Sequence, residues 1–267
     1  MNKKKKMAEL SSQEYGVMIG DRLNFAASEA YKLLRTNLEF ALAEGQGCRV
    51  VGVTSSVRGE GKSTTTLNLA YSIAETGKYV LVVEGDMRLP TLSKRLNLSN
   101  TKGISNLLAG QCNGAEVLQK SGLHKNLWVI TAGDIPPNPS ELLGSEQMRI
   151  TMDVLCKDFD FILLDLPPVN AVSDPLVVSK LVDGMILVVR QNYSNRRALA
   201  EAVRQLRFVD AKILGFVMTG VNGAETGRKR YYKRYYKQYG YGYEYGYGYG
   251  NNQENRENKQ KQETTNS

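Results

Sequence analysis

Histidine, cysteine and long apolar runs are scarce in this sequence of 267 residues, which has one histidine and three cysteines. Cys48, Cys112 and Cys156 are odd in number and widely spaced, which argues against a disulfide framework and against a cysteine metal site. The longest apolar runs, at 161–164 and 185–189, are far shorter than the roughly 20 residues that a bilayer-spanning helix needs. We therefore expect reduced thiols and a cytoplasmic protein with no segment across a membrane.

The middle of the chain has no net charge, although the whole chain carries +8. Residues 1–10 hold four Lys and one Glu, and residues 228–267 hold nine Lys and Arg against four Glu, which leaves 22 basic and 22 acidic residues between them. Grooves that bind nucleic acid carry clustered Lys and Arg, which replace condensed counterions. The neutral middle therefore argues against nucleic acid as a partner of the folded part, and any polyanion would have to contact the two ends.

The large aliphatic residues, together with Phe and Trp, stop after Val221, and this divides the chain into three parts. Residues 222–267 contain no Val, Ile, Leu, Met, Phe or Trp. Such a segment cannot bury enough apolar area to offset the entropy cost of ordering it. We predict a flexible basic N-terminus at 1–21, one folded domain at 22–222 and a disordered tail at 223–267.

Short runs rich in apolar and β-branched residues recur within the predicted domain. They lie at 50–54, 79–84, 127–131, 161–165, 185–189 and 213–219. Near-continuous apolar runs are typical of strands buried on both faces of a parallel sheet. Asn138 and Asp174 each precede a proline, which indicates helix starts between strands, and a further helix is predicted to begin at Ser194 or Asn195. Together these patterns predict an α/β fold with a doubly wound, mostly parallel sheet.

A glycine-containing loop at 55–61 joins the first predicted strand to a predicted helix, KSTTTLNLA, that starts at Lys62. The order strand, glycine loop, Lys-Ser, helix is the context that a phosphate-binding P-loop requires, because backbone N–H groups and the helix N-terminus cradle phosphate. Lys62 would reach the β and γ oxygens, and Ser63 would bind Mg²⁺. Ser56 stands where the plain motif has its first glycine. The alternative is a glycine-rich turn before an ordinary helix.

Two acidic clusters end predicted strands, which is where an open α/β sheet binds its ligands. The first, EGDMRLP, contains Glu84, Asp86 and Arg88, and the second is Asp165 at the end of FILLD. An apolar strand that delivers one carboxylate fits a Walker B acid that holds Mg²⁺. Either cluster alone could be a helix cap or a turn. Their occurrence together with the glycine loop favours a nucleotide and metal site.

These motifs resemble those of the bacterial tyrosine kinases that regulate capsule and exopolysaccharide synthesis. TSSVRGEGKST at 54–64 resembles their Walker A motif, EGDMRLP at 84–90 their Walker A′ motif and FILLDLPPV at 161–169 their Walker B motif. AGDIPPNPSELL at 132–143 is similar to a further segment of the family. The partition and septum-placement ATPases, which share this deviant Walker branch of the P-loop fold, carry an additional lysine where this chain has Val57.

The resemblance implies ATP and Mg²⁺ as cofactors and phosphorylation of clustered C-terminal tyrosines between neighbouring subunits of a ring-like homo-oligomer. It also implies a transmembrane activator, the chain-length regulator of polysaccharide synthesis, and a cognate tyrosine phosphatase. Such a kinase would be of the cytoplasmic, stand-alone type and would be recruited to the inner face of the cell membrane by its partner.

Two departures from the family pattern are expected to matter. Glu84 stands where the family usually has Asp, and a carboxylate misplaced by about 1 Å can cost about 10²-fold in rate. We therefore expect Asp at position 84 to keep or raise activity. The second departure is in SEAYKLLR at 28–35, which resembles the family's oligomer-forming helix. Lys32 stands where the family has an Arg, and Lys cannot form the bidentate hydrogen bonds that Arg forms. The predicted interface residues are Glu29, Lys32 and Arg35, and the alternative is a solvated charged helix face.

Ten of the 15 tyrosines lie in the 19 residues from 231 to 249. A phenol can accept a phosphoryl group, and disorder lets each hydroxyl enter an active site. The predicted phosphoacceptors are Tyr231, Tyr232, Tyr235, Tyr236, Tyr239, Tyr241, Tyr243, Tyr245, Tyr247 and Tyr249. One alternative is a low-complexity Tyr-Gly segment. The other is a basic-aromatic segment that binds single-stranded nucleic acid or an anionic membrane.

These observations predict an ATP-dependent and Mg²⁺-dependent protein-tyrosine kinase that phosphorylates its own tail and helps to control polysaccharide synthesis and export. The predicted nucleotide-binding residues are Gly59, Glu60, Gly61, Lys62, Ser63, Thr64, Arg88 and Asn222. The predicted metal ligands are Ser63, Asp86 and Asp165. The predicted catalytic residues are Lys62, Glu84, Asp86 and Asp165, of which Asp86 or Glu84 would orient or deprotonate the phenol. Two alternatives stay open, a partition-type ATPase with a binding tail and a scaffold whose ATP site only changes its shape.

Overall fold

The computed structural model describes residues 19–43 and 47–221, and the structural statements below concern these residues. The described residues belong to one compact unit. Asn222 and the ten predicted phosphoacceptor tyrosines lie outside the described residues.

Seven strands form one sheet in the order β3-β4-β2-β5-β1-β6-β7. Their bounds are β1 Arg49–Ser55, β2 Val80–Glu84, β3 Gln119–Lys120, β4 Leu127–Ile130, β5 Phe161–Asp165, β6 Gly184–Arg190 and β7 Ile213–Thr219. All neighbouring strands are parallel except β3 and β4, which are antiparallel. The six predicted strands and the mostly parallel sheet are confirmed. The sequence does not predict β3, because its two residues carry no apolar pattern.

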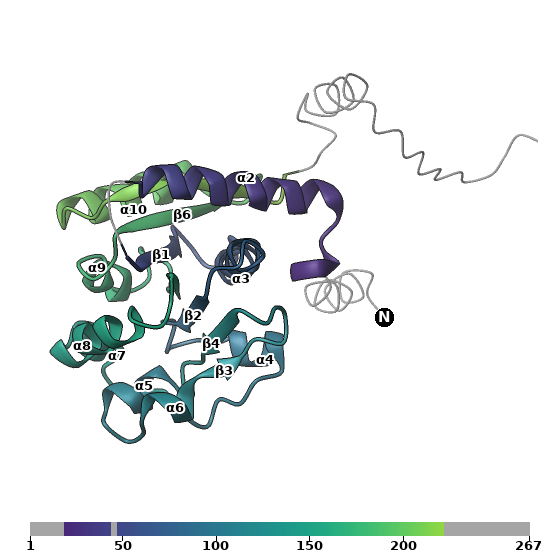
Figure 1. Cartoon of the computed structure of the whole chain (residues 1–267). Coiled ribbons are helices and arrows are strands. Elements are labelled where there is room, and N and C mark those ends of the chain that lie inside the picture. The colour runs from purple at the N-terminus through teal and green to yellow at the C-terminus, as the bar shows by residue number, and fades with distance from the viewer. Residues whose placement is uncertain (1–18, 44–46, 222–267) are drawn as a thin grey trace, which may run out of the picture. The chain divides into compact units, whose positions relative to one another are not determined.

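Helices cover both faces of this sheet. Their bounds are η1 Gly20–Arg22, α2 Phe25–Ala41, α3 Lys62–Ala74, α4 Leu92–Leu96, α5 Ile104–Leu108, α6 Gly114–Val117, α7 Pro139–Leu143, α8 Glu146–Leu155, α9 Asp174–Val178 and α10 Arg196–Phe208. Figure 1 shows α3 and α4 on one face of the sheet and α7, α8 and α9 on the other. The predicted helix starts are confirmed in α7, α9 and α10, and the Asn195 side chain caps α10 by accepting from the Arg197 N–H.

None of the helices in the described part of the chain is long and apolar enough to cross a bilayer. The three cysteines are free thiols, as the sequence predicts.

Each face of the sheet has its own apolar core, because successive residues of a strand point to opposite faces. In β5, Ile162 and Leu164 pack with residues of α7, α8 and α9, whereas Phe161 and Leu163 pack with residues of α2 and α3. A strand covered on both faces needs apolar residues at consecutive positions, which explains the unbroken apolar runs in the sequence.

The sheet order places the carboxyl ends of β1, β2 and β5 side by side. Val53 of β1 and Glu84 of β2 are both register partners of Asp165 at the end of β5. The glycine loop follows β1, and the two acidic clusters end β2 and β5. All three predicted motifs therefore meet at one edge of the sheet.

Candidate active site

The loop between β1 and α3 has the left-handed glycine turns of a phosphate cradle. Gly59 and Gly61 adopt φ values of +86° and +98°. A Cβ atom on Gly59 would lie 3.0 Å from Tyr193 Oη, and one on Gly61 would lie 3.3 Å from Thr219 Oγ1. Only glycine adopts such φ values readily, and it has no Cβ atom to crowd these neighbours. Gly61 also caps α3, so the first N–H groups of the helix and the positive end of its dipole face the loop.

Lys62 and Ser63 open α3 next to the acids of the neighbouring strands. Lys62 is 9% exposed, and its positive charge lowers the pKa of both Asp86 and Asp165. The Ser63 hydroxyl forms a hydrogen bond with Asp165. The structure therefore brings together one cation, two carboxylates and one hydroxyl beside the anion cradle.

Asp165 is a buried carboxyl group at the end of β5. Burial raises its pKa to about 6, against the lowering effects of the Ser63 hydrogen bond and the Lys62 charge. The Thr66 hydroxyl lies 3.5 Å from Asp165 Oδ1. Because a cation nearby favours the ionised form of a buried carboxyl group, Asp165 is suited to a metal ion.

Asp86 lies in the loop after β2, and this loop is fastened to β5. The N–H groups of Gly85 and Asp86 donate to the Asp165 carbonyl at 2.9 and 3.1 Å. The Asp86 side chain is half-buried, and its Oδ1 accepts from the Leu89 N–H at 3.1 Å. Burial raises the pKa of Asp86, while Lys62 lowers it. Asp86 can therefore approach a ligand and take up a proton.

Glu84, in contrast, is buried, and backbone N–H groups occupy both of its oxygens. Oε1 accepts from the Leu92 N–H at 2.7 Å and from the Thr91 N–H, and Oε2 accepts from the Ala132 N–H at 3.2 Å. Burial raises its pKa, while the three N–H donors lower it. Glu84 thus ties the loop before α4 and the loop after β4 to β2. Of the two acids that the sequence offers as orienting groups, the geometry favours Asp86.

For Glu84→Asp we now expect the opposite of the family-based expectation. The shorter side chain cannot span the donors of both loops, so at least one buried N–H group loses its acceptor. We expect the free energy of unfolding to fall by about 2–4 kcal/mol, with a loss of activity, in denaturant titrations and kinase assays. The control is Glu39→Asp on α2, which shortens a side chain that pairs with Lys78 at the surface. It should change the free energy of unfolding by at most about 0.5 kcal/mol. Unchanged stability with equal or raised activity in Glu84→Asp would restore the family-based expectation.

Glu60 and Thr64, both predicted to bind nucleotide, have side chains engaged within the protein. The Glu60 carboxylate is buried and accepts from the Ser56 hydroxyl at 3.0 Å and the Val57 N–H at 2.9 Å. Thr64 Oγ1 accepts from Arg95 Nη1 at 3.3 Å. Their backbone N–H groups, rather than their side chains, are therefore the groups available to contact a ligand.

Arg88 forms a bidentate ion pair with Asp174, whose side chain is fully buried. Arg88 Nε lies 3.0 Å from Asp174 Oδ2 and Nη2 lies 3.1 Å from Oδ1, and Nη2 also donates to Ser140 Oγ at 3.2 Å. Ser140 belongs to the segment 132–143, so this pair joins the loop after β2 to α7 and α9. Asp174 is not among the site residues that the sequence predicts, because an Asp-Pro pair indicates a helix start and gives no partner for the carboxylate.

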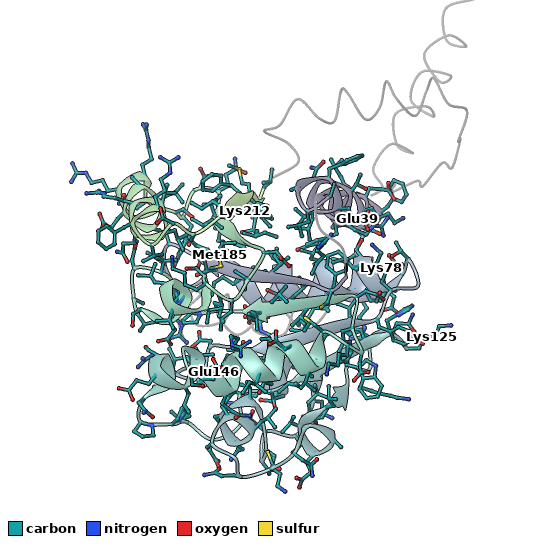
Figure 2. All side chains as sticks on the ribbon, turned by 60° about the vertical axis from the view of Figure 1, so that its left-hand side comes forward. Glu39, Lys78, Lys125, Glu146, Met185 and Lys212 are labelled. Atoms are coloured by element: carbon teal, nitrogen blue, oxygen red, sulfur yellow. The ribbon has the colours of Figure 1, made fainter. Side chains whose placement is uncertain are left out.

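The predicted interface residues on α2 make contacts within the chain. Lys32 Nζ pairs with Glu29 Oε1 at 2.8 Å on the helix surface. Arg35 Nη1 donates to the Ser72 carbonyl of α3 at 2.5 Å, which fastens α2 to α3. An interface role therefore stays a prediction for all three residues. Glu39, labelled with its partner Lys78 in Figure 2, adds a second anchor for α2 at 3.0 Å.

The described residues contain no group of three or more His, Cys, Asp and Glu side chains placed to hold a metal ion. Mg²⁺ is usually bound by one or two carboxylates, waters and substrate phosphates rather than by a full protein cage. Asp165, Asp86 and Ser63 are hard oxygen donors of this kind. Their chemistry fits a magnesium ion that arrives with a nucleotide.

A parallel sheet with a glycine cradle after β1 and an acid at the end of the neighbouring β5 defines a P-loop domain. A family model described as an AAA domain matches residues 48–212. Tyrosine-protein kinase YwqD of Bacillus subtilis is 37% identical over 205 residues, which are 77% of this chain and 86% of the relative. The putative tyrosine-protein kinase CapB of Staphylococcus aureus is 31% identical over 85% of this chain and 98% of its own length. The chain belongs to the family of bacterial tyrosine-protein kinases.

Solved structures agree with this assignment. The kinase domain of Escherichia coli tyrosine kinase ETK has a TM-score of 0.71 and 31% identity, covering 83% of this chain and 80% of that domain. The septum site-determining protein MinD of Pyrococcus horikoshii, solved with Mg-ADP, has a TM-score of 0.54 and 23% identity over 66% of this chain and 72% of that one. The second likeness shows a shared fold alone.

Proposed function

We propose that this family member transfers the γ-phosphoryl group of ATP to tyrosines of its own C-terminal tail and so helps to regulate capsular or exopolysaccharide synthesis and export. The observation that carries the proposal is the placement of Lys62, Ser63, Asp86 and Asp165 together beside the glycine cradle. The division into a kinase domain at 22–222 and an acceptor tail at 223–267 is part of the proposal.

The phosphates of ATP would be held by the N–H groups of residues 59–64 and by the ammonium group of Lys62. Ser63 and Asp165 would hold Mg²⁺. An ion held by these residues would supply positive charge that offsets the negative charge developing on the phosphates. The charge of Lys62, held at 9% exposure, acts in the same place with little screening by water.

Asp86 is the proposed group that orients the incoming tyrosine. Its half-buried carboxylate would accept the phenol proton while the phenol oxygen attacks the γ-phosphorus and ADP leaves. General base catalysis of this kind contributes about 10²–10⁴-fold. Burial raises the pKa of Asp86, which makes it a better proton acceptor than an exposed Asp.

The partners belong to the same proposal and rest on the family pattern. We propose transfer between copies in a ring-like homo-oligomer, with Glu29, Lys32 and Arg35 at or near the contact. A transmembrane chain-length regulator would activate the kinase and recruit it to the inner face of the cell membrane, and a cognate tyrosine phosphatase would reverse the reaction.

The full chain incubated with ATP and Mg²⁺ should acquire phosphotyrosine between residues 231 and 249. A matched variant with these ten tyrosines changed to phenylalanine should bind nucleotide equally well and acquire none. Polyanion-stimulated phosphate release without phosphotyrosine would instead support the partition-type ATPase. Nucleotide binding with neither product would support the ATP-switched scaffold.

A further inference from the structure

The glycine loop is held from outside by four side chains that the sequence does not connect with it. We call these residues the latch: Arg190, Tyr193, Ser194 and Thr219. Arg190 ends β6, Tyr193 and Ser194 lie in the turn between β6 and α10, and Thr219 ends β7. Three latch side chains donate hydrogen bonds to backbone carbonyl oxygens of the loop. Tyr193 Oη donates to the Arg58 carbonyl (3.0 Å), Arg190 Nη1 to the Gly59 carbonyl (3.1 Å) and Thr219 Oγ1 to the Glu60 carbonyl (2.6 Å). Consecutive peptide groups of the loop are therefore fixed by distant segments.

The fourth latch contact joins Ser194 to the carboxylate of Glu60. Glu60 is fully buried, and its oxygens accept from the Ser56 hydroxyl, the Val57 N–H and the Ser194 hydroxyl. Ser194 Oγ itself accepts from the Arg190 N–H at 2.7 Å, which leaves its proton directed at Glu60. A buried carboxylate is tolerated when donors fill its lone pairs, and here the loop and the latch supply them.

We propose that Glu60 and Ser194 are positioning residues that hold the glycine loop in its phosphate-binding shape before the nucleotide arrives. The inference rests on the proposed function, because it takes Mg·ATP as the ligand. Gly59 and Gly61 both adopt left-handed φ values, but a glycine-rich loop can adopt many other conformations. Fixing these φ values in the free protein removes an ordering cost from binding, so the latch raises affinity without touching the ligand.

The test measures the dissociation constant of a fluorescent ATP analogue with Mg²⁺ for the full chain. Ser194→Ala removes the hydroxyl and should weaken binding about tenfold, as expected for a lost hydrogen bond to a charged group. Ser194→Thr keeps the hydroxyl and should bind within about twofold of the wild type. Glu60→Gln should also weaken binding. The double variant Glu60→Gln, Ser194→Ala should have about the same dissociation constant as the single variant that binds more weakly, because both changes remove the same contact.

Two further readouts separate positioning from a general loss of stability. Ser194→Ala should raise KM for ATP with kcat within about twofold of the wild type, because the reacting groups stay in place. Thr101→Ala removes an exposed hydroxyl from a turn outside the site and should alter neither constant. Wild-type affinity in Ser194→Ala, or a lower melting temperature with unchanged affinity, would overturn the inference. Failure of the wild type to form phosphotyrosine while these affinity differences persist would overturn the proposed function alone.

Discussion

Lys62→Met is expected to abolish tail phosphorylation, with a loss of at least about 10³-fold in rate, while the chain stays folded. Lys62 contributes a charge aimed at the phosphates, and methionine replaces most of its apolar stem. The loss of this cation also removes the charge that lowers the pKa of Asp86 and Asp165, so both acids would be protonated more readily. Phosphotyrosine formation and the melting temperature are the two measurements.

The matched control for this variant is Lys125→Met. Lys125 is exposed and projects from the side of the molecule in Figure 2. The same change of residue there should leave phosphorylation and stability as in the wild type. Normal phosphotyrosine in Lys62→Met would show that the phosphates bind elsewhere.

Asp86→Asn is expected to lower kcat by about 10²–10⁴-fold with little change in nucleotide affinity. Asparagine keeps the size of the side chain and an acceptor for the Leu89 N–H, but it cannot take the phenol proton. The measurements are single-turnover phosphotyrosine formation and nucleotide titration. Asp153→Asn, on the exposed surface of α8, is the control for the same chemical change. An unchanged kcat would remove Asp86 from the reaction.

The fold was predictable because its signals are local. The buried strands appear as unbroken apolar runs, and the glycine loop lies between a strand and a helix that are adjacent in the sequence. The convergence of Lys62 with Asp86 and Asp165 follows from the rule that the carboxyl ends of parallel strands meet at one edge.

The roles of Glu60, Glu84 and Arg88 were not predictable in the same way. Their partners are far away in the sequence: Ser194 for Glu60, Ala132 for Glu84 and Asp174 for Arg88. A motif shows that a carboxylate lies near the site, but it does not show which donors fill the lone pairs of that carboxylate. The latch residues Arg190 and Tyr193 carry no sequence signal, and the sequence predicts Ser194 only as a helix start.

The most direct test of the kinase assignment is the ratio of phosphotyrosine to ADP formed by the purified full chain with labelled ATP and Mg²⁺. Transfer to the tail predicts about one phosphotyrosine for each ADP in the early phase, with the label mapped by mass spectrometry to tyrosines between residues 231 and 249. ADP formed with free phosphate and without phosphotyrosine would contradict a tyrosine kinase and support an ATPase built on the same fold.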